Sequence, residues 1–132
     1  MTSFRLSGTV LAVAALLSTA VLTGTASADD KPRSTLILRL ATPDGASSTV
    51  RLECDPAGGS HPNAKPACDE VSVAGGDFDE LPGTPQLTAC TMEYRPVVAS
   101  VRGRWEGMRV RWTHEYSNSC TLRVDTGVVF AF

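Results

Sequence analysis

Apolar and polar residues alternate along two runs in the C-terminal half of the chain, on either side of Glu106 and Gly107. In the second run one face would carry Met108, Val110, Trp112, His114 and Tyr116, and the other Arg109, Arg111, Thr113 and Glu115. A period of two is typical of a half-buried strand. Two such runs joined by a two-residue turn that ends in glycine predict a β hairpin, with strands over 97–105 and 108–116.

A second hairpin is predicted near the start of the folded part. The runs 35–40 and 48–54 flank Thr42-Pro43-Asp44-Gly45, where proline presets one dihedral angle and glycine permits a positive one. The last five residues, Val128 to Phe132, are apolar throughout and are predicted as a fifth strand.

The segments between these strands predict loops and short helices. Residues 55–66 are rich in proline and glycine and predict a loop. Residues 67–74 predict a helix, 77–81 a further helical turn, and 117–127 an irregular polar stretch with a helical turn near Cys120. The fold class that follows is α+β, with a five-stranded antiparallel sheet and two short helices on one face.

The other face of such a sheet either stays polar or meets a partner. Trp105, Trp112 and the C-terminal aromatic residues are more apolar than a free face requires. Two explanations stay open: a dimer formed through the sheet, or burial of these side chains in the core of a single chain.

The first 28 residues have the composition of a secretory signal peptide. Arg5 supplies a positive charge, Val10 to Val21 is apolar, and Ala26-Ser27-Ala28 matches the A-x-A cleavage pattern. The apolar run is too short to span a membrane. We therefore expect cleavage after Ala28, export, and one extracellular domain over 29–132.

Four cysteines lie in this domain: Cys54, Cys68, Cys90 and Cys120. An even number in an exported chain indicates two disulfides, and three pairings are possible. A zinc site is the alternative. It is disfavoured because no pair of cysteines has C-x-x-C spacing.

Composition disfavours several functions. Without Arg5 the mature chain has 11 basic and 14 acidic residues, and its arginines are scattered, so no nucleic-acid-binding patch is expected. The chain lacks the common nucleophile, zinc-protease and phosphate-loop motifs. Of its two histidines, His61 lies in a loop beside Pro62, and His114 lies on the apolar face of a predicted strand, where a packed or hydrogen-bonded histidine is more typical than a catalytic one. We expect no enzyme, cofactor or metal site.

The segment Ala89 to Val97 has a composition that suits a rigid exposed loop. Cys90 precedes Met92 by two residues, Pro96 follows four residues after Met92, and a predicted strand begins directly beyond. Such a segment can hold one large apolar side chain in an extended backbone, as protease inhibitors require. The alternative is an ordinary connection that happens to contain a methionine.

The segment from Cys90 to Val97 resembles the reactive-site segment of the subtilisin inhibitors that streptomycetes secrete. Similarity extends over the mature chain and includes His61-Pro62, Ala67-Cys68, Gly75-Gly76-Asp77, Trp105-Glu106-Gly107, Tyr116-Ser117-Asn118-Ser119-Cys120 and Val129-Phe130-Ala131-Phe132.

The resemblance implies a site and a partner. Ala89, Cys90, Thr91, Met92, Glu93 and Tyr94 would contact a subtilisin-like or chymotrypsin-like serine protease, with Met92–Glu93 as the scissile bond. Asn118 would support the loop from behind. The disulfides would be Cys54–Cys68 and Cys90–Cys120, and the protein would be a homodimer formed through the sheet.

Three residues depart from the family pattern: Glu93 stands where an apolar residue occurs, Ala89 stands where a larger apolar residue is common, and Thr91 replaces a proline. These departures bear on the choice of protease. The alternative function is a secreted, non-inhibitory binding or scaffold dimer that partners another exported enzyme.

Overall fold

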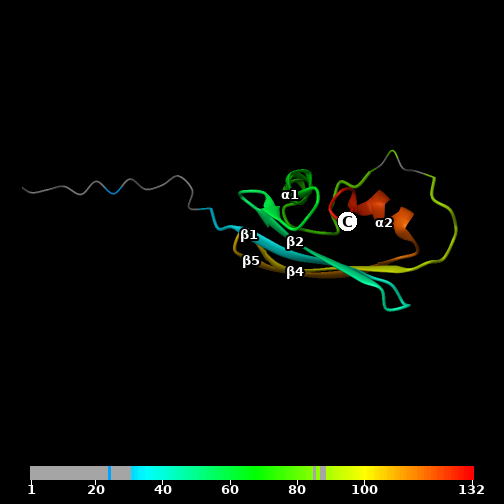
Figure 1. The fold of residues 1–132 in the computed structure, drawn as a ribbon. Coiled ribbons are helices and arrows are strands. Elements are labelled where there is room, and N and C mark those ends of the chain that lie inside the picture. The colour runs from blue at the N-terminus through cyan, green and yellow to red at the C-terminus, as the bar shows by residue number, and fades with distance from the viewer. Residues whose placement is uncertain (1–23, 25–30, 85, 87–88) are drawn as a thin grey trace, which may run out of the picture.

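The computed structural model describes residues 24, 31–84, 86 and 89–132. Five strands form one antiparallel sheet in the order β3-β2-β1-β4-β5 (Figure 1). They are β1 (Ser34–Ala41), β2 (Ser47–Cys54), β3 (Gly58–Gly59), β4 (Val97–Trp105) and β5 (Met108–Tyr116). The predicted fold class is therefore confirmed, with four of the five strands where the pattern placed them.

Both predicted hairpins are present. At the β4–β5 turn Glu106 and Gly107 have φ values of 46° and 84°, as a two-residue turn that follows the twist of the strands requires. At the β1–β2 turn Gly45 has a φ of 91°, and its amide donates to the Thr42 carbonyl over 3.0 Å.

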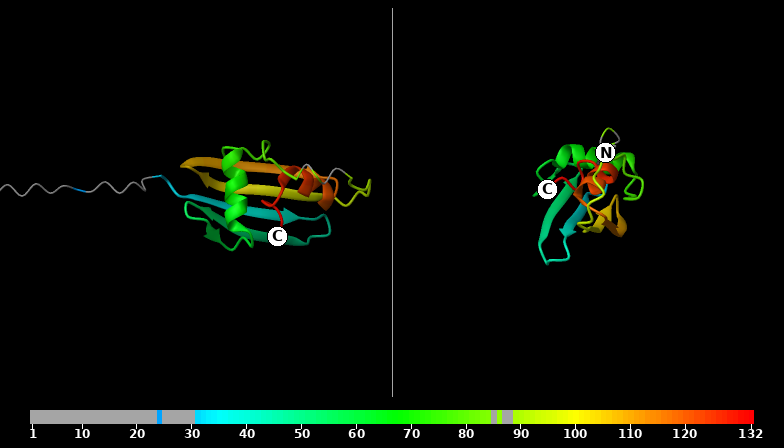
Figure 2. Two further views of the ribbon diagram at one scale, coloured as in Figure 1. Left: turned by 90° about the horizontal axis from the view of Figure 1, so that it is seen from above. Right: turned by 90° about the vertical axis from the view of Figure 1, so that its right-hand side faces the viewer.

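Two helices, α1 (Ala64–Val73) and α2 (Ser119–Thr126), cover one face of the sheet (Figure 2). The core lies between them and the strands because every second strand residue points toward the helices. Its fully buried members include Leu36, Leu38, Leu52, Val71 and Ala99.

Residues 55–66 are more ordered than the loop that their composition predicts. Gly58 and Gly59 pair with Glu53 and Leu52 as the edge strand β3. Helix α1 begins at Ala64, three residues before the predicted start. Pro66 does not prevent this, because a proline in the first helical turn removes only an amide that has no partner within the helix.

The C-terminal run is not the fifth strand, so that prediction is wrong. Residues 128–130 form turns over the core, with Val129 and Phe130 buried. The Val128 amide donates to the Glu70 carboxylate over 3.1 Å, and the Val129 carbonyl lies 2.9 Å from Nε2 of His61. Side chains from α1 and the preceding loop thus satisfy this backbone in place of a neighbouring strand.

The stretch 117–127 is a regular helix over most of its length, contrary to the irregular structure predicted. Asn118 caps α2: its Oδ1 accepts from the Thr121 amide over 3.0 Å, and Thr121 Oγ1 accepts from the Asn118 amide. Gly127 follows the last turn with a φ of 55°. The predicted turn at 77–81 is not helical; there the Asp77 side chain accepts from the Asp79 amide.

The two tryptophans lie on the covered face and not on the open one. Trp105 is buried, and Trp112 is opposite Val101 in the sheet and packs between Phe78 and Phe130. The explanation by burial in one chain is therefore confirmed for Trp105 and Phe130, while Trp112 is half-buried on the same face. These side chains give no support to a dimer.

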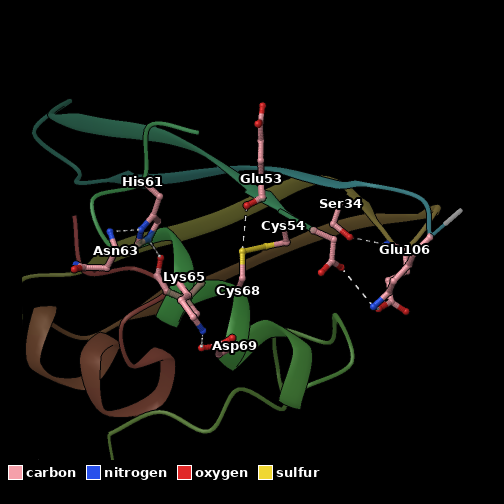
Figure 3. Close-up of a disulfide and its surroundings, with 12 residues drawn as sticks. Ser34, Glu53, Cys54, His61, Asn63, Lys65, Cys68, Asp69 and Glu106 are labelled. Carbon is pink, nitrogen blue, oxygen red and sulfur yellow. Dashed lines mark hydrogen bonds and ion pairs between the residues drawn. A yellow bond between two sulfur atoms is a disulfide. The ribbon is translucent and has the colours of Figure 1, made fainter. Parts of the chain in front are cut away.

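The Cys54–Cys68 disulfide joins β2 to α1 within the core, with a Cα–Cα distance of 5.7 Å (Figure 3). His61 lies nearby and is buried; its Nδ1 accepts from the Asn63 amide over 3.0 Å. Both nitrogens of this ring therefore have partners within the fold.

The predicted signal peptide lies outside the described residues except for Gly24. Within the described part of the chain, no helix has both the length and the apolar character to cross a bilayer.

Candidate functional site

The segment 89–96 connects the helical layer to β4 at the end of the sheet, without regular secondary structure. Five consecutive residues, 91–95, are exposed, and the Met92 side chain is 98% exposed. A large apolar side chain in that position gains nothing from the core. The exposed methionine is therefore a feature that folding of this chain does not explain.

Asn118 holds the backbone on both sides of Met92. Its Nδ2 donates to the Thr91 carbonyl over 3.1 Å and to the Glu93 carbonyl over 2.9 Å. The same side chain caps α2 through Oδ1, and it is only 6% exposed. One buried amide group thus ties the loop to the first turn of α2. Its nitrogen donates two hydrogen bonds to the loop, and its oxygen accepts one from the helix.

Two further links fix the ends of the loop. A disulfide joins Cys90 to Cys120 in the first turn of α2, with a Cα–Cα distance of 5.6 Å. Beyond Met92, the Arg95 amide donates to the Ser117 carbonyl over 2.8 Å. The covalent bond, the Asn118 bridge and this backbone bond converge on residues 117–120.

Charged side chains next to Met92 pair with one another. Arg95 Nε lies 3.0 Å from the Glu93 carboxylate, and the Tyr94 hydroxyl donates to Glu115 over 3.3 Å. Both contacts are solvent exposed, so each contributes little to stability. They do orient Glu93 and Tyr94 along the loop.

A hollow of about 620 Å³ lies beside the Glu93 side of the loop. Residues 93–97 and Asn118 form one wall, and Thr42, Pro43 and Asp44 of the β1–β2 turn form the other. A hydrogen bond from the Thr42 hydroxyl to the Asp44 carboxylate, together with one from the Ala46 amide, keeps the pKa of Asp44 below its usual value. A negative charge therefore stands on the turn that faces the loop.

Tyr116 lies at the base of the loop, opposite Val97 in the sheet. Its side chain is buried against His114, with ring centroids 4.5 Å apart. Burial, together with the negative charges of Asp125 and Asp79, raises the pKa of Tyr116 to about 12. The phenol is therefore a neutral packing group under ordinary conditions.

No group of three or more potential metal ligands occurs among the described residues. His114 is exposed and stacks on Trp112, with the rings 5.9 Å apart and nearly parallel. The site consists of a braced peptide and an exposed side chain.

A family model described as subtilisin inhibitor-like matches residues 17–118. The chain belongs to the subtilisin inhibitor-like family. Subtilisin inhibitor-like protein 1 of Streptomyces cacaoi is 45% identical over 89 residues, which are 66% of this chain and 81% of that protein. Protease inhibitor SIL-V1/SIL-V4 of Streptomyces netropsis is 42% identical over 93 residues, 70% of this chain and 84% of that protein.

A solved structure also resembles this member of the subtilisin inhibitor-like family. It is the crystal structure of Streptomyces caespitosus sermetstatin in complex with Bacillus licheniformis subtilisin. The similarity has a TM-score of 0.66 and 27% sequence identity, and covers 76% of this chain and all of the other.

The structure brings together the residues that the resemblance implied. Thr91 to Tyr94 form one exposed segment held by Asn118, half-buried Cys90 precedes it, and Ala89 is exposed at its start. Sequence reasoning missed the Arg95–Ser117 link and the Arg95–Glu93 pair. The second could have been found, since residues two apart in an extended chain lie on the same side.

Proposed function

We propose that the protein inhibits subtilisin-like or chymotrypsin-like serine proteases by offering Ala89 to Tyr94 as a substrate mimic, with Met92–Glu93 as the scissile bond. The observation that carries this is the Asn118 bridge. It fixes the carbonyl groups on either side of a side chain that is 98% exposed. Membership of the subtilisin inhibitor-like family supports the same conclusion.

The links behind the loop explain how a cleavable peptide acts as an inhibitor. A protease binds an extended strand, and a strand that is already ordered loses little conformational entropy on binding. After attack on the bond, the Cys90–Cys120 disulfide and the Arg95–Ser117 bond keep the two new ends in place. Reversal then competes with release, and the complex persists.

The side chains of the loop indicate which proteases it would bind best. Met92 is long, flexible and apolar, and suits a primary pocket that accepts large hydrophobic side chains. Glu93 places a carboxylate directly after the bond, and Arg95 pairs with it. We expect this pair to favour a protease whose primed side tolerates charge.

We further propose that residues 1–28 are a signal peptide and that the mature protein acts outside the cell. We also retain the homodimer through the open face of the sheet as a proposal. That face carries the exposed residues Arg39, Arg102 and Arg111 at neighbouring positions of the sheet, so two copies would repel each other at low ionic strength. Sedimentation at low and high salt tests this: the dimer should strengthen as salt is added, and a monomer at every salt concentration would contradict it.

The decisive experiment is a titration of subtilisin and chymotrypsin with the mature protein, followed by mass analysis of any clipped bond. We expect stoichiometric inhibition and, on long incubation, slow cleavage between Met92 and Glu93. Full residual protease activity in excess protein would contradict the proposal and favour the non-inhibitory binding dimer.

Asn118→Asp is the sharpest variant for this experiment. Aspartate caps a helix as well as asparagine does, so α2 should be retained. The two donors to Thr91 and Glu93 are lost, however, and a carboxylate faces their carbonyl groups. We expect inhibition to weaken by roughly thirty- to a hundredfold, the equivalent of about two hydrogen bonds, with faster cleavage at Met92–Glu93. Unchanged inhibition would show that the bridge is not what holds the loop.

A further inference from the structure

A hollow of about 240 Å³ lies between β5 and α2, on the side of the sheet that the helices cover. Its lining includes His114 and Tyr116 of β5, Asp125 of α2, and Phe78 and Asp79 of the segment that follows α1. None of the residues 89–94 lines it, so it is separate from the protease-facing loop. The proposed dimer would bury the opposite face of the sheet and would leave this hollow free.

The Tyr116 hydroxyl faces this hollow without a partner. The residue is only 6% exposed, and its ring packs against His114. Among the described residues the hydroxyl makes no hydrogen bond, yet no side-chain nitrogen or oxygen in that part of the chain is both fully buried and unpartnered. The hydroxyl therefore reaches the hollow that its ring lines. Polar groups at this depth are normally hydrogen-bonded, so a molecule in the hollow has to supply the partner.

Two carboxylates stand beside this hydroxyl. Asp125 lies in the last turn of α2 and Asp79 on the facing segment, and neither forms an ion pair among the described residues. Burial and the charges of Asp125 and Asp79 raise the pKa of Tyr116 to about 12, so both carboxylates act on the phenol. The carboxyl end of a helix adds negative potential. No lysine or arginine of the described chain lines the hollow, so it favours a cation.

Aromatic rings form the wall on β5. The rings of Phe78, Trp112, His114 and Tyr116 follow one another, with successive centroids 5.7, 5.9 and 4.5 Å apart. Three of these four rings line the hollow. The face of an aromatic ring attracts a cation. The rings and the carboxylates therefore favour the same sign of charge in a ligand.

We propose that this hollow binds a guanidinium group, carried either by a small free guanidine or by an arginine side chain of another polypeptide. A guanidinium is planar, stacks on aromatic rings, and presents N–H donors in a fork that matches a carboxylate. It can donate to Asp125, to the Tyr116 oxygen and to Oδ2 of Asp79. The other oxygen of Asp79 already accepts from Trp112 over 2.8 Å, which holds this carboxylate in place.

The size and the donor set of the hollow narrow the ligand further. In liquid water one molecule occupies about 30 Å³, so 240 Å³ corresponds to roughly eight waters. That is room for a guanidinium group and a short alkyl chain. A compact, strongly hydrated ammonium group would gain less from the rings. The described residues contain no group of three metal ligands, so an organic cation suits the hollow better than a metal ion.

The test compares two double variants that remove the same charge from neighbouring positions. Asp79→Asn with Asp125→Asn removes both carboxylates of the hollow, and an amide oxygen at position 79 still accepts from Trp112. Asp77→Asn with Glu80→Gln is the matched control, because both side chains are exposed in the same segment and neither lines the hollow.

Ethylguanidinium chloride is titrated into the isotope-labelled mature protein at pH 7.5 and constant ionic strength, and the amide signals are followed by NMR. Ethylammonium chloride tests the need for the planar group, and sodium chloride is the reference. N-acetylarginine amide represents an arginine within a polypeptide. The amide spectrum of each variant also shows whether it is folded, so the result does not depend on protease inhibition.

We expect saturable shifts at the amides of His114, Tyr116 and Asp125, with one guanidinium bound per chain. The Asp79/Asp125 variant should lose at least about tenfold in affinity, because hydrogen bonds to charged groups are lost, and the Asp77/Glu80 variant should bind like the unaltered protein. Tyr116→Phe removes only the hydroxyl and should lose about fivefold, the size of one hydrogen bond. Tighter binding of N-acetylarginine amide than of ethylguanidinium would identify an arginine of a polypeptide as the ligand, and equal binding a free guanidine.

Four results would overturn the proposal. They are an equal loss in the two double variants, which would indicate general attraction to an acidic surface; unchanged binding by Tyr116→Phe; equal binding of ethylammonium; and shifts no larger than those that sodium chloride causes.

Discussion

The two disulfides are alike in chemistry and differ in what they hold. Cys54–Cys68 joins β2 to α1 inside the core, and both of its residues are buried. Cys90–Cys120 joins an exposed loop to α2 and lies only half-buried. With sequence separations of 14 and 30, chain entropy assigns them similar values, about 3 and about 3.5 kcal/mol.

The difference between them is therefore positional. The first bond restrains elements that the core already packs together, so it acts on the stability of the whole domain. The second bond restrains a segment with few other contacts, so it acts on the shape of the loop. The following predictions separate these two roles.

The largest effect is expected from Cys90→Ser with Cys120→Ser. If the constraint acts mainly on the loop, its loss weakens inhibition of subtilisin by up to several hundredfold, which corresponds to about 3.5 kcal/mol. Inhibition kinetics and mass analysis should show rapid cleavage at Met92–Glu93. A variant that still inhibits at full strength would show that the Cys90–Cys120 disulfide is not what keeps the loop in its inhibitory shape.

Cys54→Ala with Cys68→Ala should have the opposite profile. We expect the free energy of unfolding to fall by about 3 kcal/mol, measured by urea denaturation, because the bond restrains the unfolded chain. Inhibition should stay unchanged at temperatures where the variant is folded. Loss of inhibition in a variant that is still folded would contradict the claim that the Cys54–Cys68 disulfide acts on stability alone.

Met92→Lys tests the side chain that the second disulfide presents. We expect at least about a thirtyfold loss against subtilisin, the size of a 2 kcal/mol interface residue, and a gain against trypsin. Met108→Lys is the matched control, since Met108 is also exposed, at 66%, but lies in the β4–β5 hairpin. Equal effects of the two substitutions would show that Met92 is not the specificity residue.

The smallest effect is expected from Glu70→Gln in the region of the first disulfide. Burial raises the pKa of Glu70 above its reference value of 4.5, although the Val128 amide donates to it. A carboxyl with a raised folded-state pKa stabilises the fold below its unfolded pKa and loses that contribution as the pH rises through the folded value.

The unaltered protein should therefore lose stability relative to Glu70→Gln as the pH rises above 4.5 and through the raised folded-state pKa, as measured by urea midpoints at increasing pH. The glutamine oxygen can still accept from Val128. Inhibition of subtilisin should be the same for both proteins. If the two proteins had the same dependence of stability on pH, the pKa of Glu70 would not be raised in the folded protein.

The sequence predicted the sheet best where one face is buried and the other is not. In β5 the alternation of Met108, Val110 and Trp112 with arginines predicts both a strand and which of its faces points toward the core. The same alternation places the arginines of this strand on the open face. The register that brings Arg39 near Arg102 and Arg111 depends on three strand pairings, and these are not local properties that a single run of sequence predicts.

The terminal segments were predicted less well because their partners are distant in sequence. Val128 to Phe130 is apolar enough for a strand, but Glu70 and His61 bind its backbone from α1 and the preceding loop. For α2 a signal was present, since Asn118 and Gly127 suit the two ends of a helix. The bridge from Asn118 to the loop came from the family resemblance and not from any local pattern.

Asn118 couples the shape of the protease-facing loop to the folding of α2. The side chain that caps α2 also holds the backbone on both sides of Met92, so the loop is held in this shape only when the first turn of α2 has formed. We expect a copy in which α2 is unfolded to offer a protease the same peptide without this support and to be digested. Destruction of defective copies and protection of intact ones then follow from a single amide group.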